Sequence, residues 1–98
     1  MPWMYILQCS DGSYYVGSTR DLDRRVWEHN QGTGAKYTAR RRPVKLMYSE
    51  QYDSVPEAYA REKQVQGWGR AKREALIHGD FGALPGLARK DFKSGQED

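Results

Sequence analysis

The sequence predicts a small mixed α/β domain of the α+β class, in which three strands and three helices follow in the order β-β-α-β-α-α. The chain has 98 residues, and about 100 to 200 residues are typical of a single domain. Its first part has the strand and turn composition of a β-hairpin, and two later segments begin at helix-capping residues. Residues 1–78 are predicted to form the domain, and residues 79–98 a loosely packed tail that is disordered at its end.

The first two strands are predicted at residues 3–9 and 14–17, which are rich in aromatic and β-branched residues. Loop length decides which side chains share a face, because side chains alternate along a strand. A two-residue loop, Asp11-Gly12, would place Tyr5 and Tyr15 on opposite faces. A three-residue loop that starts at Ser10 places both tyrosines on one face and gives Gly12 the left-handed position of a bulged hairpin. We favour the three-residue loop, and the other register stays open.

The first helix is predicted from the capping residue Asp21 to Gln31, with Gly32 as its end. Leu22 and Val26 are four residues apart and supply its core-facing stripe.

Residues 32–42 hold glycines, threonines and bases without apolar periodicity, which predicts an exposed basic loop. The third strand is predicted at residues 43–49, where alternation places Val44, Leu46 and Tyr48 on one face.

The second helix is predicted from Ser54 to Gln66, because Ser54 and Glu57 have the Ser-x-x-Glu spacing of a capping box. Residues 67–69, Gly-Trp-Gly, end it, and residues 70–77 form a short basic third helix.

Composition excludes several classes of protein. No window of about 18 apolar residues occurs, which excludes a membrane span, and the N-terminus lacks the pattern of a secretory signal. With Cys9 as the single cysteine, an internal disulfide is impossible, and a Cys/His zinc site fails because only His29 and His78 could join it. We expect a cytoplasmic protein with no membrane contact and no small-molecule cofactor.

Positive charge is concentrated in the middle of the chain. The net charge is +3, but residues 20–73 hold thirteen Lys and Arg against seven Asp and Glu. Residues 36–45 hold five bases and no acid, which predicts an anion-binding face; a solvated basic surface is the alternative. The candidate nucleic-acid-binding residues are Lys36, Arg40, Arg41, Arg42, Lys45, Arg70 and Lys72.

Arg25 and His29 are four residues apart in the first predicted helix and therefore lie on one face, beside its buried stripe. One interpretation is structural, with Arg25 a surface base and His29 a satisfied, partly buried imidazole. The other is functional, with a guanidinium that binds phosphate and an imidazole that relays a proton near neutral pH. Spacing alone leaves both open.

Glu62 falls within the apolar arc of the second predicted helix, together with Val55, Ala58 and Val65. A carboxylate there is costly to ionise unless a cation pairs with it. The partner is either a base, with Arg25 as the candidate for a structural ion pair, or Mg²⁺. Magnesium takes one or two protein carboxylates and fills its other positions with water and phosphate.

Tyr5 and Tyr15 are, taken alone, ordinary sheet residues. Together with the carboxylate of Glu62, Arg25 and His29, beneath a basic loop, they form a group of side chains suited to hydrolysis of a phosphodiester. The sequence offers no P-loop, no Cys/His nucleophile pair and no carboxylate cluster for a two-metal site.

Five segments, in order and at matching spacing, resemble the GIY-YIG nuclease domain: Met4-Tyr5-Ile6, Tyr15-Val16-Gly17, Arg25, His29-Asn30, and Glu62 within Arg61-Glu62-Lys63-Gln64. The resemblance covers about residues 3–77, and residues 62–73 look like the small stand-alone bacterial members. It implies a three-stranded, mainly antiparallel sheet flanked by helices. It also implies endonucleolytic cleavage of DNA with Mg²⁺, or Mn²⁺ in its place. The family includes homing endonucleases, restriction enzymes, Holliday-type resolvases and the incision subunit of excision repair.

By position, the resemblance implies that Tyr5 helps to activate the attacking water and that Tyr15 is its neighbour in the same site. Arg25 matches the phosphate-binding arginine, and Glu62 matches the single metal ligand. His29 matches a histidine that is linked to proton transfer in some branches.

The sequence also departs from the family pattern. Met4 replaces the glycine of the name motif, Val16 replaces the isoleucine, and Ser18 stands where certain members have a lysine. No asparagine follows Asn30, so the late asparagine of some homing-type members is absent. These departures leave catalysis in place as an expectation but weaken any inference about substrate preference.

We therefore predict a metal-dependent DNA endonuclease of low sequence specificity, since a chain of 98 residues has no room for a separate DNA-reading domain. Single-stranded or branched DNA is the expected preference, because Trp27, Tyr37 or Trp68 could stack on bases. The alternative is a non-catalytic DNA-binding module. A third class is a structural adaptor whose basic surface meets an acidic protein. DNA cleavage separates the first class from the other two.

Overall fold

The computed structural model describes residues 1–79, which contain three strands and four helices. The strands form one antiparallel sheet in the order β2-β1-β3, which confirms the expected fold. The elements are β1 (Trp3–Gln8), β2 (Tyr14–Thr19), α1 (Leu22–Gln31), α2 (Lys36–Ala39), β3 (Lys45–Gln51), α3 (Val55–Gln66) and α4 (Arg70–Ile77). Residues 1–66 form one compact unit and α4 belongs to a second. The expected tail, residues 79–98, lies outside the described residues except for Gly79.

The β1–β2 hairpin has the favoured three-residue loop. The Cys9 amide donates to the Ser13 carbonyl at 2.8 Å, and the Gly12 amide donates to the Cys9 carbonyl at 2.9 Å. Gly12 has a φ of +86°, the left-handed conformation that glycine adopts without steric cost. In this register Tyr5 and Tyr15 lie on the same face of the sheet.

The β3 strand contains an irregularity that the sequence did not predict. Leu46 pairs with Leu7 but Tyr48 pairs with Ile6, so the register shifts between these two pairs. Since Ile6 and Leu7 point to opposite faces, Leu46 and Tyr48 do too. The expectation that Val44, Leu46 and Tyr48 share a face is therefore wrong, because one extra residue in β3 reverses the alternation.

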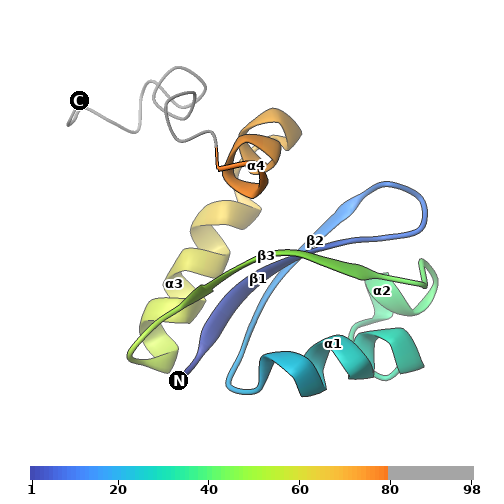
Figure 1. The fold of residues 1–98 in the computed structure, drawn as a ribbon, viewed down its shortest axis with the longest axis horizontal. Coiled ribbons are helices and arrows are strands. Elements are labelled where there is room, and N and C mark those ends of the chain that lie inside the picture. The colour runs from blue at the N-terminus through green and yellow to red at the C-terminus, as the bar shows by residue number, and fades with distance from the viewer. Residues whose placement is uncertain (80–98) are drawn as a thin grey trace. The chain divides into compact units, whose positions relative to one another are not determined.

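The central strand β1 is buried on both faces of the sheet. Figure 1 shows α1 and α2 on one side of the sheet and α3 on the other. On the first side, the core consists of Tyr5, Leu7, Cys9 and Val44, with Tyr15, Leu22 and Val26 packed against it. On the α3 side, the buried residues are Met4, Ile6, Val16, Ala58 and Val65. Because both faces of the sheet are covered, the sequence of β1 is a nearly continuous run of apolar residues.

The predicted helix caps are present. The Asp21 side chain accepts a hydrogen bond from the Arg24 amide at 3.2 Å, and Gly32 closes α1 with a φ of +85°. At the start of α3, the Ser54 hydroxyl accepts from the Glu57 amide at 3.3 Å. No helix within residues 1–79 is long and apolar enough to cross a membrane.

The segment 32–42 is more ordered than the exposed basic loop that we expected. It contains the short helix α2, and Thr38 within that helix is fully buried. Thr38 is held by a hydrogen bond to the buried His29, a contact between side chains nine residues apart that hydrophobic periodicity does not report. The expectation of a loop is therefore wrong at α2, and the expected exposure holds for Lys36 and Tyr37 but not for Thr38.

Candidate active site

Tyr5 reaches its position because its partner across the sheet is a glycine. Tyr5 pairs with Gly17 of the edge strand β2. A Cβ atom on Gly17 would lie 2.5 Å from the Tyr5 hydroxyl oxygen and 3.1 Å from the Tyr15 ring. Any side chain at position 17 would thus occupy the space of the phenol, so glycine is required for a close approach and not for its φ.

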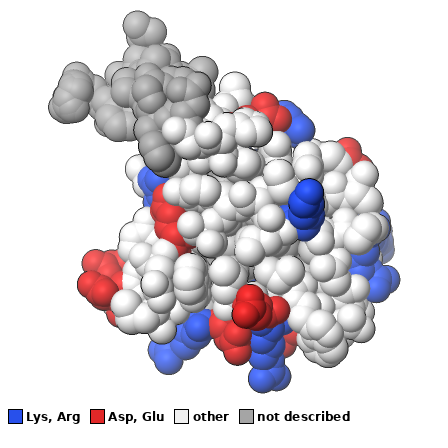
Figure 2. All heavy atoms as spheres, viewed as in Figure 1, with Lys and Arg blue, Asp and Glu red and all other residues white. Residues whose placement is uncertain are grey.

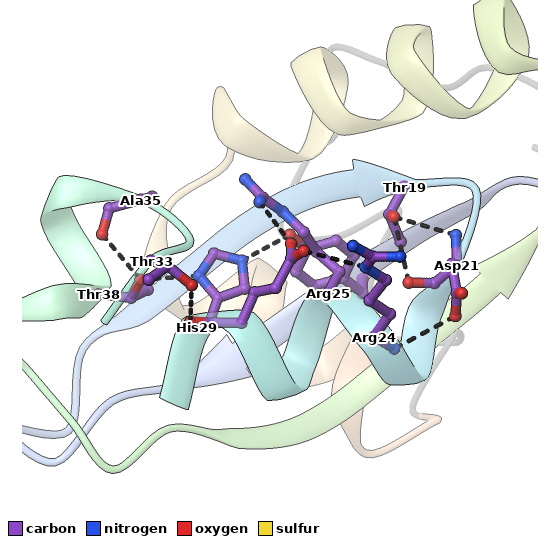
Figure 3. Close-up of polar contacts among 10 residues, drawn as sticks. Thr19, Asp21, Arg24, Arg25, His29, Thr33, Ala35 and Thr38 are labelled. Atoms are coloured by element: carbon purple, nitrogen blue, oxygen red, sulfur yellow. Dashed lines mark hydrogen bonds and ion pairs between the residues drawn. The ribbon is translucent and has the colours of Figure 1, made fainter. Parts of the chain in front are cut away.

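His29 lies in the last turn of α1 and is fully buried. Its Nε2 atom is 2.8 Å from the Tyr5 hydroxyl, and its Nδ1 atom is 2.7 Å from the Thr38 hydroxyl. Figure 3 shows the imidazole directed toward Thr38 on one side. Gly34 packs against the ring, since a Cβ atom there would lie 2.5 Å from Nδ1.

The hydrogen bonds of Thr38 determine which nitrogen of His29 carries the proton. The Thr38 hydroxyl donates to the Ala35 carbonyl at 3.1 Å, and a hydroxyl has one proton to donate. Its oxygen must therefore accept from Nδ1–H of His29, which leaves Nε2 as an acceptor. It follows that the Tyr5 hydroxyl donates to Nε2 and that the chain of bonds is directed from Tyr5 through His29 to Ala35.

Burial shifts the pKa values of Tyr5 and His29 in opposite directions. It raises the pKa of the Tyr5 phenol well above its usual range, against a smaller lowering by a hydrogen bond from Arg25. Burial, followed by the positive charge of Arg25, lowers the pKa of His29 from 6.5 to about 4. Both groups are therefore uncharged at neutral pH.

Tyr15 joins this pair to a row of rings. Its ring centroid lies 6.4 Å from that of Tyr5 and 5.0 Å from that of His29. On its other side it stacks with Tyr37 at 6.2 Å, and the Arg41 guanidinium lies 3.8 Å from the Tyr37 centroid. Burial raises the pKa of Tyr15. The row connects α2 to the two tyrosines of the sheet.

Arg25 lies one turn before His29 on α1, as Figure 3 shows. Its Nη1 atom is 3.1 Å from a Glu28 carboxylate oxygen, and about a third of its side chain, 31%, is exposed. Its charge lowers the pKa values of Tyr5 and Tyr15. Arg25 therefore faces the two phenols from the rim of the site, where part of its side chain is accessible to solvent.

Glu62 enters the site from α3. Its side chain is 13% exposed, and it accepts hydrogen bonds from the Ser18 hydroxyl at 2.6 Å and the Gln66 amide at 2.8 Å. The charge of Glu62 also acts to raise the pKa values of Tyr5 and Tyr15. Because Ser18 lies on the α3 face of β2 and Tyr5 on the α1 face, the site is assembled at the edge strand from both faces.

The partners of Glu62 differ from the structural ion pair that the sequence suggested. Arg25 is bonded to Glu28, and the cation that approaches Glu62 within 4 Å among residues 1–79 is Lys63, at 3.9 Å. Polar but mostly uncharged donors thus hold the carboxylate in place.

The comparison with protein families decides the identity of this fold. Residues 1–75 match the family model described as the GIY-YIG catalytic domain. This chain belongs to the GIY-YIG family.

Similar proteins include UPF0213 proteins that the chain matches over most of their length. The chain is 51% identical over 77 residues to a UPF0213 protein of Halobacterium salinarum, covering 79% of this chain and 100% of the relative. It is 45% identical over 75 residues to a UPF0213 protein of Staphylococcus saprophyticus, covering 76% of this chain and 92% of the relative. These matches agree with the expected small stand-alone type.

Two solution structures share the fold. A UPF0213 protein from Bacillus halodurans has a TM-score of 0.52 at 43% identity, covering 80% of this chain and 84% of the other. A protein from E. faecalis has a TM-score of 0.54 at 40% identity, covering 79% and 82%. Membership of the family implies a nuclease-like fold, and GIY-YIG enzymes are generally endonucleases that act on DNA with divalent metal ions.

The residues of this GIY-YIG domain suit a single hard cation at Glu62. Each carboxylate oxygen of Glu62 accepts one hydrogen bond, and a carboxylate has about four acceptor positions in all. Within residues 1–79 no group of three or more His, Cys, Asp or Glu side chains is placed to hold a metal. One carboxylate is enough for Mg²⁺, which keeps several waters and binds substrate phosphate.

The predicted nucleic-acid-binding residues fall into two groups. Some are engaged: Arg41 contacts Asp11 at 3.1 Å, Arg42 donates to the Ala39 carbonyl at 2.9 Å, Arg70 pairs with Glu74 at 3.0 Å, and the largely buried Lys72 lies 4.0 Å from the Trp68 ring centroid. In the described part of the chain, Lys36, Arg40 and Lys45 are exposed, and their side chains form no hydrogen bond or ion pair. On the face in Figure 2, bases lie scattered among acidic and uncharged residues.

Sequence reasoning missed the residues that position the site. Thr38 orients His29, Ser18 and Gln66 hold Glu62, and Gly34 packs on the imidazole. Spacing gave no signal for Thr38 or Gly34. Gln66 could have been predicted as a partner of Glu62, because it is four residues further along and therefore shares the same helical face.

Proposed function

We propose that this chain is a divalent-metal-dependent endonuclease that hydrolyses DNA phosphodiester bonds with low sequence specificity and prefers single-stranded or branched DNA. Mg²⁺ is the proposed ion and Mn²⁺ its substitute. The observation that carries the proposal is the buried hydrogen bond from Tyr5 to an uncharged His29. This bond provides a route by which a phenol with a raised pKa can give up its proton.

In the proposed reaction, Tyr5 removes a proton from the attacking water. The phenol is protonated at neutral pH because burial raises its pKa, so its own proton must leave as the new one arrives. Nε2 of His29, 2.8 Å away, receives it. The water oxygen forms a bond to phosphorus while the bond from phosphorus to the 3′-oxygen breaks, and the 3′-oxygen leaves with the electron pair and takes a proton from solvent. Thr38 keeps Nε2 available by accepting from Nδ1–H.

Charge stabilisation is assigned to Arg25 and Glu62. Arg25 binds the phosphate through the part of its guanidinium that Glu28 leaves accessible. Glu62 would hold a divalent cation, which would supply positive charge against the negative charge that develops in the reaction. Such preorganised charge is generally the largest contribution to the rate. Tyr15 orients Tyr5 by ring contact, with their centroids 6.4 Å apart.

Low sequence specificity is supported by the kind of surface available. Exposed bases such as Lys36 and Arg40 contact phosphates, which carry no sequence information. Trp27 is 61% exposed, so it can stack on unpaired bases, whereas the Tyr37 ring is covered by Tyr15 and Arg41. A role in DNA repair and a cytoplasmic location stay predictions.

The test compares wild type with Tyr5→Phe and Glu62→Gln on single-stranded, duplex and branched oligonucleotides, with Mg²⁺, with Mn²⁺ and with a chelator. We expect metal-dependent cleavage by wild type, a loss of at least about a hundredfold in each variant, and unchanged circular dichroism. Tyr59→Phe and Glu57→Gln are matched controls, because both side chains are exposed outside the site. Full activity of Glu62→Gln contradicts the metal role, and DNA binding without cleavage by wild type favours the non-catalytic module.

A further inference from the structure

A small cavity adjoins Glu62 on the α3 side of the sheet. It has a volume of about 100 Å³ and is lined by Pro2, Ser18, Thr19, Arg20, Val55 and Ala58. None of these residues has a role in the proposed reaction apart from Ser18. Ser18 lines the cavity and its hydroxyl donates to Glu62 at 2.6 Å, so Ser18 connects the cavity to the carboxylate.

The wall of this cavity combines apolar surface with one cation. Pro2, Val55 and Ala58 supply the apolar part, and Val55 is 40% exposed. Arg20 is exposed and, within residues 1–79, forms no hydrogen bond or ion pair. A guanidinium both stacks on planar rings and binds phosphate through a fork of donors. Apolar surface beside a guanidinium with no acidic partner matches the two parts of a nucleotide.

The segment that carries Arg20 is already held in place. The Thr19 hydroxyl donates to the Asp21 carbonyl at 3.3 Å and accepts from the Asp21 amide at 3.1 Å. These bonds fix the turn between β2 and α1 on both sides of position 20. A second hollow shares Pro2, Arg20 and Val55 with the cavity and is also lined by Asp53, which forms no ion pair with Arg20 within 4 Å in the described part of the chain.

We propose that this cavity binds the base of an unpaired nucleotide next to the phosphate that is cut, while Arg20 binds the adjoining phosphate. The proposal rests on the proposed nuclease function and names its substrate as a strand with unpaired bases. In another protein, an apolar cavity of roughly 150 Å³ takes up a benzene ring, so a cavity of about 100 Å³ that is open on one side accommodates part of a base. A base that is paired and stacked in a duplex cannot enter without first being extruded.

The test measures binding, in a chelator so that no strand is cut, of two labelled single-stranded probes by fluorescence anisotropy. One probe is a short thymidine oligonucleotide, and the other has the same phosphates but lacks every base. We expect the abasic probe to bind at least about fivefold more weakly, the lower limit for one stacked base. Equal binding of the two probes overturns the proposal.

Variants assign the effect to this cavity. Arg20→Gln should weaken binding of the thymidine probe about fivefold or more, whereas Arg24→Gln, which removes the same charge from a side chain 74% exposed on α1, should change it less than about twofold. Val55→Glu should reduce the difference between the probes, and Val55→Leu should keep it. Glutamate is tolerated at this first position of α3 because its negative charge interacts favourably with the positive end of the helix dipole. Equal losses in Arg20→Gln and Arg24→Gln overturn the proposal, since they show a non-specific charge effect.

Failure of the nuclease function gives a different result from failure of this cavity. If wild type cuts DNA with metal but binds the two probes equally, the nuclease stands and the cavity proposal falls. If the probes and variants behave as expected but wild type cuts nothing with Mg²⁺ or Mn²⁺, the catalytic proposal falls and base binding by the cavity stands.

Discussion

The direction of the hydrogen bonds around His29 determines what this site can do at the scale of single residues. His29 is uncharged at neutral pH because burial lowers its pKa to about 4, and its Nδ1 proton is committed to Thr38. The lone pair on Nε2 therefore accepts the hydrogen bond from the Tyr5 hydroxyl. A charged imidazole in the same place would donate to the phenol oxygen instead and could not take its proton.

Thr38 offers a direct test of this arrangement. Thr38→Val leaves the Nδ1–H of His29 without an acceptor in the core, and an unpaired buried donor costs about 1–3 kcal/mol. We expect the free energy of unfolding, measured in urea, to fall by that amount and kcat for cleavage to fall more than KM changes. Thr38→Ser keeps the hydroxyl and should preserve both. Wild-type stability and activity in Thr38→Val would contradict the tautomer that we assign.

Sequence analysis named the chemical groups of the site but not the contacts that hold them. It weighed Arg25 as a partner for Glu62, whereas Arg25 pairs with Glu28, three residues further along the same helix. A contact within one helix orders few additional residues, so it forms in preference to one between elements. Glu62 is held instead by Ser18 and Gln66.

At the scale of elements, local signals gave reliable predictions and long-range pairing did not. Asp21, Gly32 and Ser54 cap their helices as expected, because each cap bond closes within a few residues. The irregularity in β3 depends on pairing with β1, which is distant in the sequence. The short helix α2 depends on the contact between Thr38 and His29. Neither leaves a periodic pattern in the amino-acid sequence.

Because the Tyr5 phenol lies directly against Gly17 of β2, adding one methyl group at position 17 should affect both activity and stability. In Gly17→Ala the new Cβ would lie 2.5 Å from the Tyr5 hydroxyl oxygen, which displaces the phenol from His29. We expect cleavage to be lost and the free energy of unfolding to fall by about 1–3 kcal/mol, as measured by initial rates and urea denaturation. Gly69→Ala is the matched control, since a Cβ there meets nothing within 4 Å. An active Gly17→Ala would contradict the placement of Tyr5.

The stability of the whole molecule should depend on pH through His29. Its pKa is about 4 when folded, against 6.5 normally, so the unfolded chain binds the proton more tightly. The stabilisation is fully present above about pH 6.5 and is lost as the pH falls toward 4. It corresponds to at most about 3 kcal/mol. Urea denaturation across this range should show a steeper loss in wild type than in His29→Gln, and identical pH profiles would contradict the burial of a neutral imidazole.

The dependence of DNA binding on salt should reveal which bases of the molecule touch phosphate. When the logarithm of the binding constant is plotted against the logarithm of the salt concentration, the slope for a single strand becomes less steep by about 0.7 for each phosphate contact that is removed. We expect Lys36→Gln and Arg40→Gln to lower the slope by about this amount each, because both side chains are exposed and lack partners within residues 1–79. Arg41 is bonded to Asp11 and Tyr37, so Arg41→Gln should change the slope less. The reverse order would contradict this assignment.

The edge strand β2 is covered by side chains of the candidate site, and this cover limits its pairing with a strand of another chain. The Tyr5 phenol crosses β2 at Gly17, and the Gln66 amide donates to the Val16 carbonyl at 3.1 Å. A strand from another chain could not align there without displacing one of them. The side chains that we assign to the proposed DNA hydrolysis thereby also oppose aggregation at this edge strand.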